Sequence, residues 1–242
     1  MCSEEYLPTN RGFDSFFGQL TDQSDHYTRL HYNNEYIGSG YDLWANTTVS
    51  YEGAGLYSAE LWAREAGEKI EELETSDKPW LLQVSFTSSS PSYQAPDSFM
   101  ELYDNQTSYS KEEFEEKVVR RAMVSAMDKA VGDIISKLRE SKDWENTVVI
   151  FLSDNGSSVK EGNLPFRGGR GSPLEGGVRV PALVVSPLLR EEARGSRLTE
   201  MVHMTDILPT ILHLAGHVVA VKILRNINKS FLSLPLPGLV DD

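Results

Sequence analysis

The sequence predicts an α/β protein, and three observations indicate that class. The run Val148–Leu152 is apolar, rich in β-branched residues and too short for a helix of its own, which is typical of a strand buried on both faces. Trp80–Phe86 is a second apolar run of strand length. Ser58–Leu73 and Ser110–Ser141 instead carry apolar residues at helical spacing. Strand and helix patterns therefore alternate along the chain.

The N-terminal part of the chain offers few regular elements. Residues 11–20, RGFDSFFGQL, intersperse phenylalanines with small and polar residues, and we interpret them as a core-packing loop. Residues 21–57 show no sustained period and predict an irregular surface excursion with room for a short hairpin. His26 and His31 lie there, and solvated histidines are a better interpretation than ligands.

The two predicted helices carry different boundary signals. Ser58–Leu73 has a charged outer face and is followed by Asp77–Pro79, which breaks it ahead of the strand. The second helix starts at a capping box, in which Ser110 is followed three residues later by Glu113. Because its span exceeds a typical globular helix, we expect a break or bend near Gly132.

The densest cluster of chemical groups follows the strand Val148–Leu152. Asp154-Asn155-Gly156 places a carboxylate and an amide oxygen just past its end, where open α/β sheets bind ligands. The next loop is rich in glycine, which lets backbone N–H groups approach a ligand, and in arginine, which matches an oxyanion. This pattern predicts a hard-cation site beside an anion-binding loop. The loop residues are Gly162, Gly168, Gly169, Gly171, Gly176, Gly177, Arg167, Arg170 and Arg179.

Simpler interpretations apply to single parts of this stretch. Asn155-Gly156 is a strong hairpin signal and would by itself indicate a turn between strands. Residues 167–171, RGGRG, also fit an RGG-type nucleic-acid segment, although the run occurs once and the chain is acidic. The strand, the DNG motif and the arginine-glycine loop together are more specific than any one of them.

Two further elements complete the predicted fold. Val180–Pro187 predicts another buried strand, and Leu198–Gly216 predicts a helix that starts around Thr205. His203 and His213 lie in this last stretch, and we interpret both as packing residues.

Five motifs stand in a defined order along the chain, and at these residues it resembles the sulfatase family. The resemblance lies within the alkaline-phosphatase-like superfamily, is closest to arylsulfatase B-like enzymes and covers residues 6–216. It implies a three-layer sandwich with a mostly parallel central sheet, incomplete at its N-terminus. Residues 1–216 are then the C-terminal portion of a sulfatase domain, and residues 217–242 a divergent tail or translated sequence foreign to the gene. The motifs are Arg11–Leu20, Met123–Leu138, Asn146–Gly156, Arg167–Pro187 and His203–Gly216.

The resemblance also implies site residues. It implies a calcium ion held by four side chains, two of which match Asp154 and Asn155, and a sulfate-binding lysine whose position Arg170 occupies. A formylglycine nucleophile in a C-x-P-S-R segment and a histidine that protonates the leaving alkoxide are implied as well. Cys2, the only cysteine, lies in no such segment, and Ser90 occupies the histidine's position. No residue of this chain is therefore assigned as a certain catalytic group.

The implied function is hydrolysis of sulfuric esters of aryl or glycosaminoglycan type. The alternative is a catalytically inactive sulfatase-like protein, acting as an interaction protein or standing as a truncated gene product. Ser90 and Arg170 favour this alternative because both depart from the family pattern. A C-x-P-S-R segment in the upstream coding sequence would favour the enzyme.

Composition limits the partners of the chain. Apolar residues make up 40% and charged residues 24% of the 242 residues, as in ordinary globular proteins. A formal charge of −13 disfavours nucleic acid and anionic membrane surfaces. No stretch approaches the ~20 apolar residues of a membrane span. The single cysteine excludes an internal disulfide.

Signals for localisation point in two directions. The first residues, MCSEEYLPTNRG, lack the basic and apolar regions of a secretory signal, which predicts a cytosolic chain. The resemblance implies a lysosomal or secreted glycoprotein instead. Glycosylation sequons occur at Asn46, Asn105, Asn155 and Asn228. Asn46 and Asn105 suit surface acceptors, whereas Asn155 lies within the predicted site.

Overall fold

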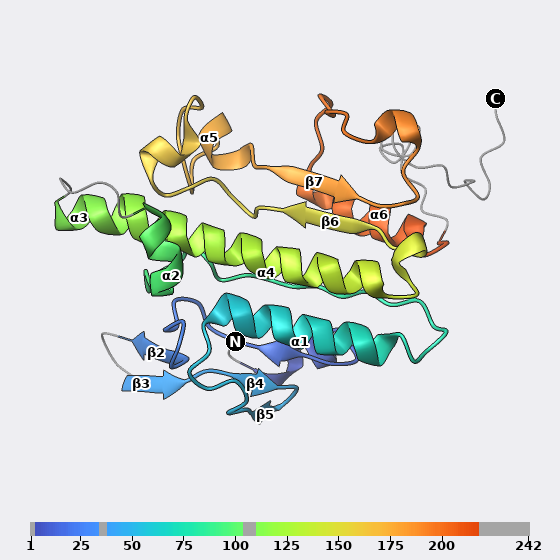
Figure 1. The fold of residues 1–242 in the computed structure, drawn as a ribbon, viewed down its shortest axis with the longest axis horizontal. Helices are drawn as coiled ribbons and strands as arrows, with labels where there is room; N and C mark the ends of the chain where they lie inside the picture. The colour runs from blue at the N-terminus through green and yellow to red at the C-terminus, as the bar shows by residue number, and fades with distance from the viewer. Residues whose placement is uncertain (1–2, 34–37, 104–109, 218–242) are drawn as a thin grey trace. The chain divides into compact units, whose positions relative to one another are not determined.

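The computed structural model describes residues 3–33, 38–103 and 110–217 (Figure 1). The chain divides into two compact units, Met1–Ser141 and Lys142–Asp242. The predicted sulfatase portion, residues 1–216, thus extends over both units. Of the predicted tail, residues 218–242 lie outside the described part of the chain.

The first unit combines small sheets with helices. Its elements are β1 (Phe17–Gly18), β2 (Leu30–Asn33), β3 (Gly38–Tyr41), β4 (Trp44–Ala45), β5 (Thr48–Val49), α1 (Ser58–Leu73), α2 (Asp97–Met100), α3 (Lys111–Phe114) and α4 (Arg120–Glu140). β2 pairs with β3, and β4 pairs with both β1 and β5, always antiparallel. The region predicted as irregular therefore contains short hairpins.

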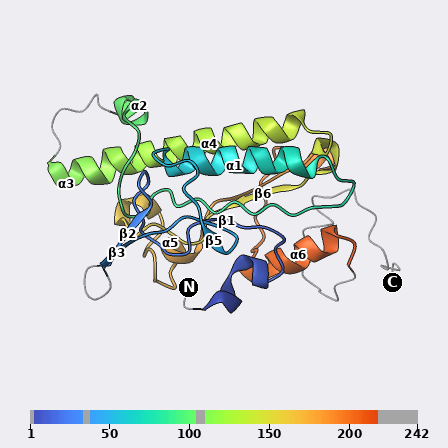
Figure 2. The same ribbon diagram turned by 90° about the horizontal axis from the view of Figure 1, so that it is seen from below.

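The core of the first unit lies where α1 and α4 run side by side, as two perpendicular views show (Figure 1, Figure 2). Leu61 and Ile70 of α1 and Met123 of α4 are fully buried. Burying such a side chain contributes about 2 kcal/mol. An ion pair between Lys137 and Glu71 joins the two helices at the surface. The helix predicted from the apolar spacing of residues 58–73 is confirmed with the same bounds.

The start of the second predicted helix is confirmed, but its irregularity was wrongly placed. The N–H of Glu113 donates to Ser110 Oγ, and the N–H of Ser110 donates to Glu113 Oε2, which closes the predicted capping box. A π-helical turn, Glu115–Val119, separates α3 from α4, whereas the helix continues regularly through Gly132. Helix packing on both sides of Gly132 outweighs the roughly 1 kcal/mol that glycine costs within a helix.

The strand predicted at residues 80–86 is wrong, because this segment belongs to none of the three sheets in the described residues. Its side chains alternate between half-buried and exposed, as those of a strand do. Val84 and Phe86 pack against the buried cluster formed by Leu43, Leu61 and Trp62. The apolar pattern therefore indicated burial correctly, but a strand also needs a neighbouring backbone that completes the hydrogen-bond ladder.

The second unit is built on β6 (Val149–Leu152) and β7 (Ala182–Val185), with the short helix α5 (Glu175–Val178) and the helix α6 (Ile207–Leu214). β6 and β7 confirm two predicted strands, but they pair antiparallel, with Val149 opposite Val185 and Leu152 opposite Ala182. Every strand pair in the described residues is antiparallel, so the predicted parallel sheet is not among them.

Burial of β7 differs from the prediction. All four of its residues are exposed, and Leu183 retains 61% exposure, whereas β6 is half-buried. The prediction of a buried strand at residues 180–187 was therefore wrong. A sheet of two strands has too little area to bury an apolar run on both faces, whatever the sequence of that run.

The last predicted helix begins close to the expected residue, since a 3-10 turn, Met204–Asp206, runs directly into it. α6 starts at Ile207, after a capping arrangement in which the N–H of His203 donates to Asp206 Oδ2 at 2.7 Å and His203 Nδ1 accepts from the N–H of Thr205. His203 is therefore an exposed capping residue rather than a packing residue. Pro209 lies in the first turn of α6, where a missing N–H costs little. Among the helices of the described residues, none has the length and apolar character needed to cross a membrane.

Candidate functional site

Asp154 and Asn155 follow directly on the end of β6, as predicted. Asp154 is exposed, and its Oδ1 accepts from the N–H of Asn155 at 2.7 Å. Asn155 Nδ2 donates to the carbonyl oxygen of Gly156 at 3.0 Å, and its own carbonyl accepts from Ser153 Oγ at 3.0 Å. Because the amide nitrogen is engaged by the backbone, the side-chain oxygen is the atom of Asn155 that can bind a hard cation.

A simple hairpin turn at this motif is excluded, because β6 and β7 are joined by a long loop, residues 153–181. Backbone bonds fold this loop onto itself: the N–H of Gly156 donates to Gly177 O at 2.9 Å, and the N–H of Gly176 donates to Arg167 O at 2.8 Å. A Cβ at Gly156 would overlap the carbonyl oxygen of Gly176. These N–H groups thus bind the loop itself rather than an anion, and here glycine serves close backbone packing.

Arg170 is held close to the motif through its backbone. Its N–H donates to Ser157 O at 3.1 Å, while its side chain is exposed and has no hydrogen-bond partner within the described part of the chain. Arg179 is different, because its guanidinium pairs with Glu175 at 3.0 Å and stacks over Phe166 at 4.7 Å. Of these two arginines, Arg170 is therefore the one free to bind an anion.

Asn163 is a site residue that the sequence did not single out. It is 8% exposed, its Oδ1 accepts from the N–H of Ser157 at 2.8 Å, and its Nδ2 donates to the carbonyls of Ser157 at 2.8 Å and Val159 at 3.2 Å. Asn163 therefore fixes the backbone that in turn holds Arg170. The one available signal was an asparagine inside a polar loop, where its amide often binds nearby backbone.

Ser90 belongs to the first unit, in a loop at residues 87–94. It is half-buried, and its N–H donates to Thr87 O at 3.2 Å. Further along this loop, Arg120 of α4 donates to the Tyr93 hydroxyl and lies 4.0 Å from the centre of its ring. Ser90 therefore lies in the first unit, while Asp154, Asn155 and Arg170 all lie in the second unit.

His26 was wrongly predicted to be solvated. It is 2% exposed, its ring stacks on Tyr57 with 5.4 Å between ring centres, and its Nδ1 lies 2.6 Å from Ser58 Oγ. Burial lowers the pKa of His26, although the adjoining backbone of Ser90 opposes that shift. His31 is half-buried, and its Nδ1 lies 2.8 Å from Asp22 O.

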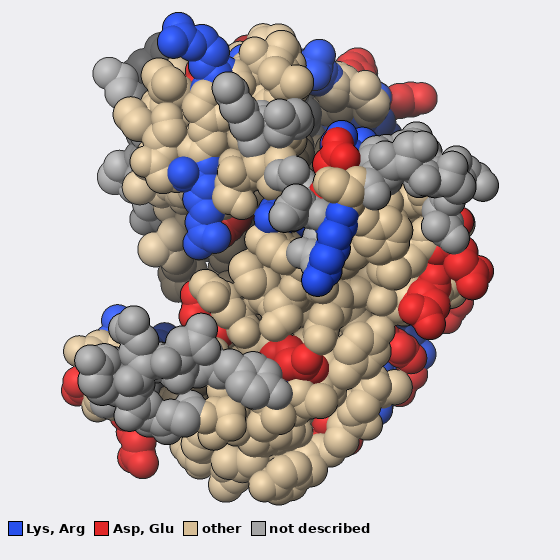
Figure 3. All heavy atoms as spheres, turned by 90° about the vertical axis from the view of Figure 1, so that its left-hand side faces the viewer, with Lys and Arg blue, Asp and Glu red and all other residues tan. Residues whose placement is uncertain are grey.

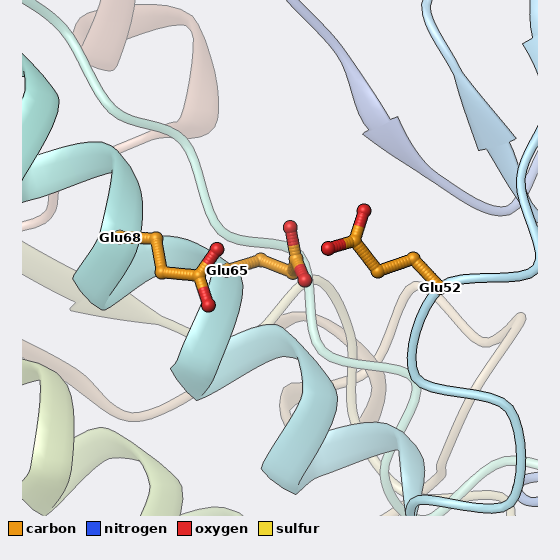
Figure 4. A group of neighbouring side chains, drawn as sticks. All are labelled: Glu52, Glu65 and Glu68. Atoms are coloured by element: carbon orange, nitrogen blue, oxygen red, sulfur yellow. The ribbon is translucent and has the colours of Figure 1, made fainter.

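A second acidic group lies in the first unit. Glu65 and Glu68 of α1 approach Glu52, with ligand oxygens within 4.8 Å of one another (Figure 4). Arg64 pairs with Glu65 at 2.6 Å and with Glu68 at 3.6 Å. The hydrogen bond to Glu65 raises the pKa of Arg64. We interpret this group as an ion-paired surface cluster, since an arginine already pairs with two of its three carboxylates.

The charge pattern on the surface agrees with the acidic composition. Figure 3 shows one face on which Lys and Arg side chains occur among uncharged and acidic residues, without a continuous basic surface in its coloured part. Proteins that bind nucleic acid concentrate Lys and Arg on one face. The coloured part of this face shows no such concentration.

Comparison with known proteins identifies the family of the chain. The sulfatase family model matches residues 1–217. This chain belongs to the sulfatase family. It is 33% identical to arylsulfatase J of Mus musculus over 216 residues, which cover 88% of this chain and 34% of that protein. It is 40% identical to steryl-sulfatase of Mus musculus over 103 residues, covering 38% of this chain and 16% of that protein.

A solved structure supports the same relationship. The crystal structure of Ps i-CgsB in complex with k-i-k-neocarrahexaose matches with a TM-score of 0.77 and 27% identity, covering 90% of this chain and 49% of that one. The chain therefore spans about a third of the length of arylsulfatase J and about half of this solved neighbour.

Proposed function

We propose that this chain supplies the metal- and sulfate-binding part of an arylsulfatase B-like enzyme that hydrolyses aryl or glycosaminoglycan-type sulfate esters. Asp154 and Asn155 would hold calcium through side-chain oxygens, and Arg170 would bind a sulfate oxygen. One observation carries the proposal: the N–H of Arg170 donates to Ser157 O at 3.1 Å, two residues after Asn155, while the Arg170 side chain is exposed and has no hydrogen-bond partner within the described residues. We further propose that the mostly parallel sheet of the family surrounds β6 in the complete fold.

The residues present fit part of a calcium site. Carboxylate and amide oxygens suit calcium, which takes 6–8 oxygen ligands, and two side chains provide at most about three. Within the described residues, Asp154 belongs to no group of three or more clustered acidic, histidine or cysteine side chains. We therefore expect roughly millimolar calcium affinity for the pair, increasing when a sulfate ester contributes further oxygens.

Arg170 would position the substrate by charge and geometry. Its planar guanidinium can donate two parallel hydrogen bonds to a sulfate group, whereas the ammonium of the family's lysine is a point charge with a different reach. Calcium, when bound, would add positive charge beside the same oxygens. Both groups would favour binding of the ester anion and withdraw charge from its sulfur.

An inactive sulfatase-like protein is the second candidate, and two residues favour it. Ser90 cannot protonate a leaving alkoxide near neutral pH, and Arg170 positions sulfate differently from lysine. A protein with these replacements would bind sulfate esters without releasing sulfate. This candidate differs from the first in turnover but not in binding.

Localisation follows the same reasoning. As a relative of arylsulfatases, the protein would act in lysosomes or outside the cell and carry N-linked glycans. Asn46 is exposed in the turn between β4 and β5, and its Oδ1 accepts from the N–H of Phe16 at 2.9 Å. Its Nδ2 would therefore be the atom that faces a glycosylating enzyme. Asn105 and Asn228 lie outside the described residues.

Titration calorimetry of the complete chain with inorganic sulfate, with and without calcium chloride, tests the binding site. We expect calcium to strengthen sulfate binding, and Asp154→Ala or Arg170→Ala to weaken it at least tenfold, about 1.4 kcal/mol. Asp133→Ala in α4 and Arg197→Ala, an exposed arginine of the second unit outside this loop, are the controls and should change affinity less than twofold. Sulfate binding that ignores calcium and Arg170 would overturn the proposal.

A second experiment separates the two candidates. The chain fused to the N-terminal half of an active sulfatase is assayed with a chromogenic aryl sulfate in the presence of calcium. Turnover by the fusion identifies an enzyme that tolerates Ser90 and Arg170. A folded but silent fusion that gains activity with Ser90→His and Arg170→Lys identifies the inactive relative.

A further inference from the structure

A network of buried side chains holds the loop that carries Ser90. At the end of this loop, Gln94 Oε1 accepts from the N–H of His26 at 2.9 Å, and Gln94 Nε2 donates to Asp25 Oδ2 at 2.6 Å. The hydroxyl of Tyr57 donates to the backbone carbonyl of Gln94 at 3.0 Å. One glutamine is thus bound by two segments that precede it by 68 and 37 residues.

His26 is the buried centre of this network. Its Nδ1 is bonded to Ser58 Oγ, and its ring lies against Tyr57 and beside the backbone of Ser90. The guanidinium of Arg29, itself fully buried, donates to the carbonyl oxygen of His26. Ring Nδ1, backbone N–H and backbone carbonyl of His26 are therefore all engaged, which favours a single position of this residue.

Asp25 completes the network at its exposed side. Its Oδ1 accepts from the N–H groups of Tyr27 at 2.9 Å and Thr28 at 2.7 Å, while its Oδ2 accepts from Gln94. Although burial by itself would raise the pKa of Asp25, these hydrogen bonds lower it to about 2. A carboxylate that stays charged is a strong acceptor, which favours a fixed orientation of the glutamine amide.

We propose that Asp25, His26 and Gln94, here named the His26–Gln94 clamp, position loop 87–94 and the Ser90 side chain that it carries. His26 is on this proposal a positioning residue that acts through the loop. The loop needs such a clamp because it lies in no sheet, and the backbone bond from Ser90 to Thr87 is a local turn. This anchoring does not depend on the proposed function.

A purely structural histidine would be satisfied by the Ser58 hydroxyl alone. The clamp differs because two of its bonds join distant segments of the chain through Gln94, a half-buried residue of the loop itself. Removing Gln94 should therefore release the loop and leave the core between α1 and α4 intact. This difference makes the two roles separable by experiment.

Hydrogen exchange of the complete chain, followed by mass spectrometry, measures each region separately. We expect Gln94→Ala and His26→Phe to accelerate exchange of residues 87–94 about tenfold or more, with exchange in α4 unchanged. His26→Asn, whose amide can reach the position of Nδ1, should restore part of the protection. His31→Phe is the matched control, since His31 is a half-buried histidine of the same unit bonded to Asp22.

Two results would overturn the clamp. Equal acceleration throughout residues 3–141 would make these residues core packing, and unchanged exchange of loop 87–94 in Gln94→Ala would show that the loop is anchored elsewhere. If His26→Phe fails to fold, Gln94→Ala decides, because its side chain lies at the edge of the core. Sulfate titration of the same variants tests the proposed function independently. If the wild-type chain binds no sulfate but the variants show the expected exchange pattern, the proposed function is wrong and the clamp is retained.

Discussion

The two loops that carry the predicted site residues are held in opposite ways. Loop 87–94 is fixed through its half-buried Gln94 side chain, which binds the backbone N–H of His26 and the carboxylate of Asp25 in a distant part of the chain. The loop that follows β6, residues 153–181, is fixed mainly by backbone hydrogen bonds and by glycines that allow two segments of the loop to approach each other closely. We call it the backbone-held loop. The conformation of the first loop therefore depends on side-chain hydrogen bonds. The conformation of the second depends on glycines, whose missing Cβ allows close backbone packing.

This difference also separates what each loop exposes. Around the DNG motif the packing is made by backbone, so the side chains of Asp154 and Arg170 remain exposed for a ligand. In loop 87–94 the side chain of Gln94 is engaged by anchoring, whereas Thr87 Oγ1 and Ser88 Oγ are buried without a hydrogen-bond partner among the described residues.

The largest expected effect is that of adding a single methyl group, at Gly156, to the backbone-held loop. Gly156→Ala places a Cβ onto the carbonyl oxygen of Gly176, and we expect a loss of about 3–5 kcal/mol in the free energy of unfolding of the second unit. Urea unfolding measures it. Gly132→Ala in α4, where a Cβ meets nothing within 4 Å, is the control and should stabilise by about 0.5–1 kcal/mol. Equal midpoints for both variants would contradict a backbone-held loop.

Asn163 is the exception that sharpens the comparison, because it is a buried side chain within the backbone-held loop. Asn163→Ala removes three hydrogen bonds and leaves the N–H of Ser157 unpaired, so we expect about 2 kcal/mol of destabilisation. Weaker sulfate binding should accompany it, since Ser157 holds Arg170. Asn146→Ala, an exposed asparagine of the same unit, should change neither quantity. Normal sulfate affinity in Asn163→Ala would show that Arg170 does not depend on this support.

Acid should accelerate hydrogen exchange in loop 87–94 and leave exchange in the loop that follows β6 unchanged. His26 has a lowered pKa when folded, so between its ordinary value of 6.5 and that lower value an open loop binds a proton that the closed loop does not. Protection of loop 87–94, corrected for intrinsic exchange, should therefore fall by up to about tenfold per pH unit below 6.5.

Asp25, Arg29 and Tyr57, which neighbour His26, do not change their charge between pH 7 and pH 5. The pKa of Asp25 is lowered from 3.8 to about 2, so its own contribution is lost only below pH 3.8, while Arg29 and Tyr57 keep one charge state throughout. Hydrogen exchange at pH 7, 6 and 5 checks the expectation. His26→Phe should abolish the dependence in loop 87–94, and a dependence that persists in this variant would assign it to another group.

The smallest expected effect belongs to the exposed ion pair of the backbone-held loop. Arg179 and Glu175 remain 63% and 60% exposed, and such pairs contribute less than about 1 kcal/mol. Arg179→Gln should therefore change the unfolding free energy of the second unit by less than about 0.5 kcal/mol. A loss above 1 kcal/mol in urea unfolding would mean that the stacking over Phe166, rather than the ion pair, supports the loop.

Local patterns were sufficient for the helices and for the family. The period of apolar residues in Ser58–Leu73 gave both ends of α1, and the Ser110–Glu113 box gave the start of α3, because both signals act within a few residues. The DNG motif and the arginine-glycine loop gave the position of the candidate site, since the order of motifs along a chain is a property of the sequence itself.

Tertiary structure decided what depends on distant partners. Trp80–Phe86 has the composition of a strand but lies in no sheet, and β7 has that of a buried strand but is exposed, because both properties require a neighbour that composition does not supply. His26 appeared as one histidine in a polar region, and only folding placed it between Ser58 and Gln94. The sequence by itself therefore determined the family and the two long helical segments, whose signals are local, and it selected the candidate site residues. The anchoring of both loops was decided by contacts between residues far apart in the chain.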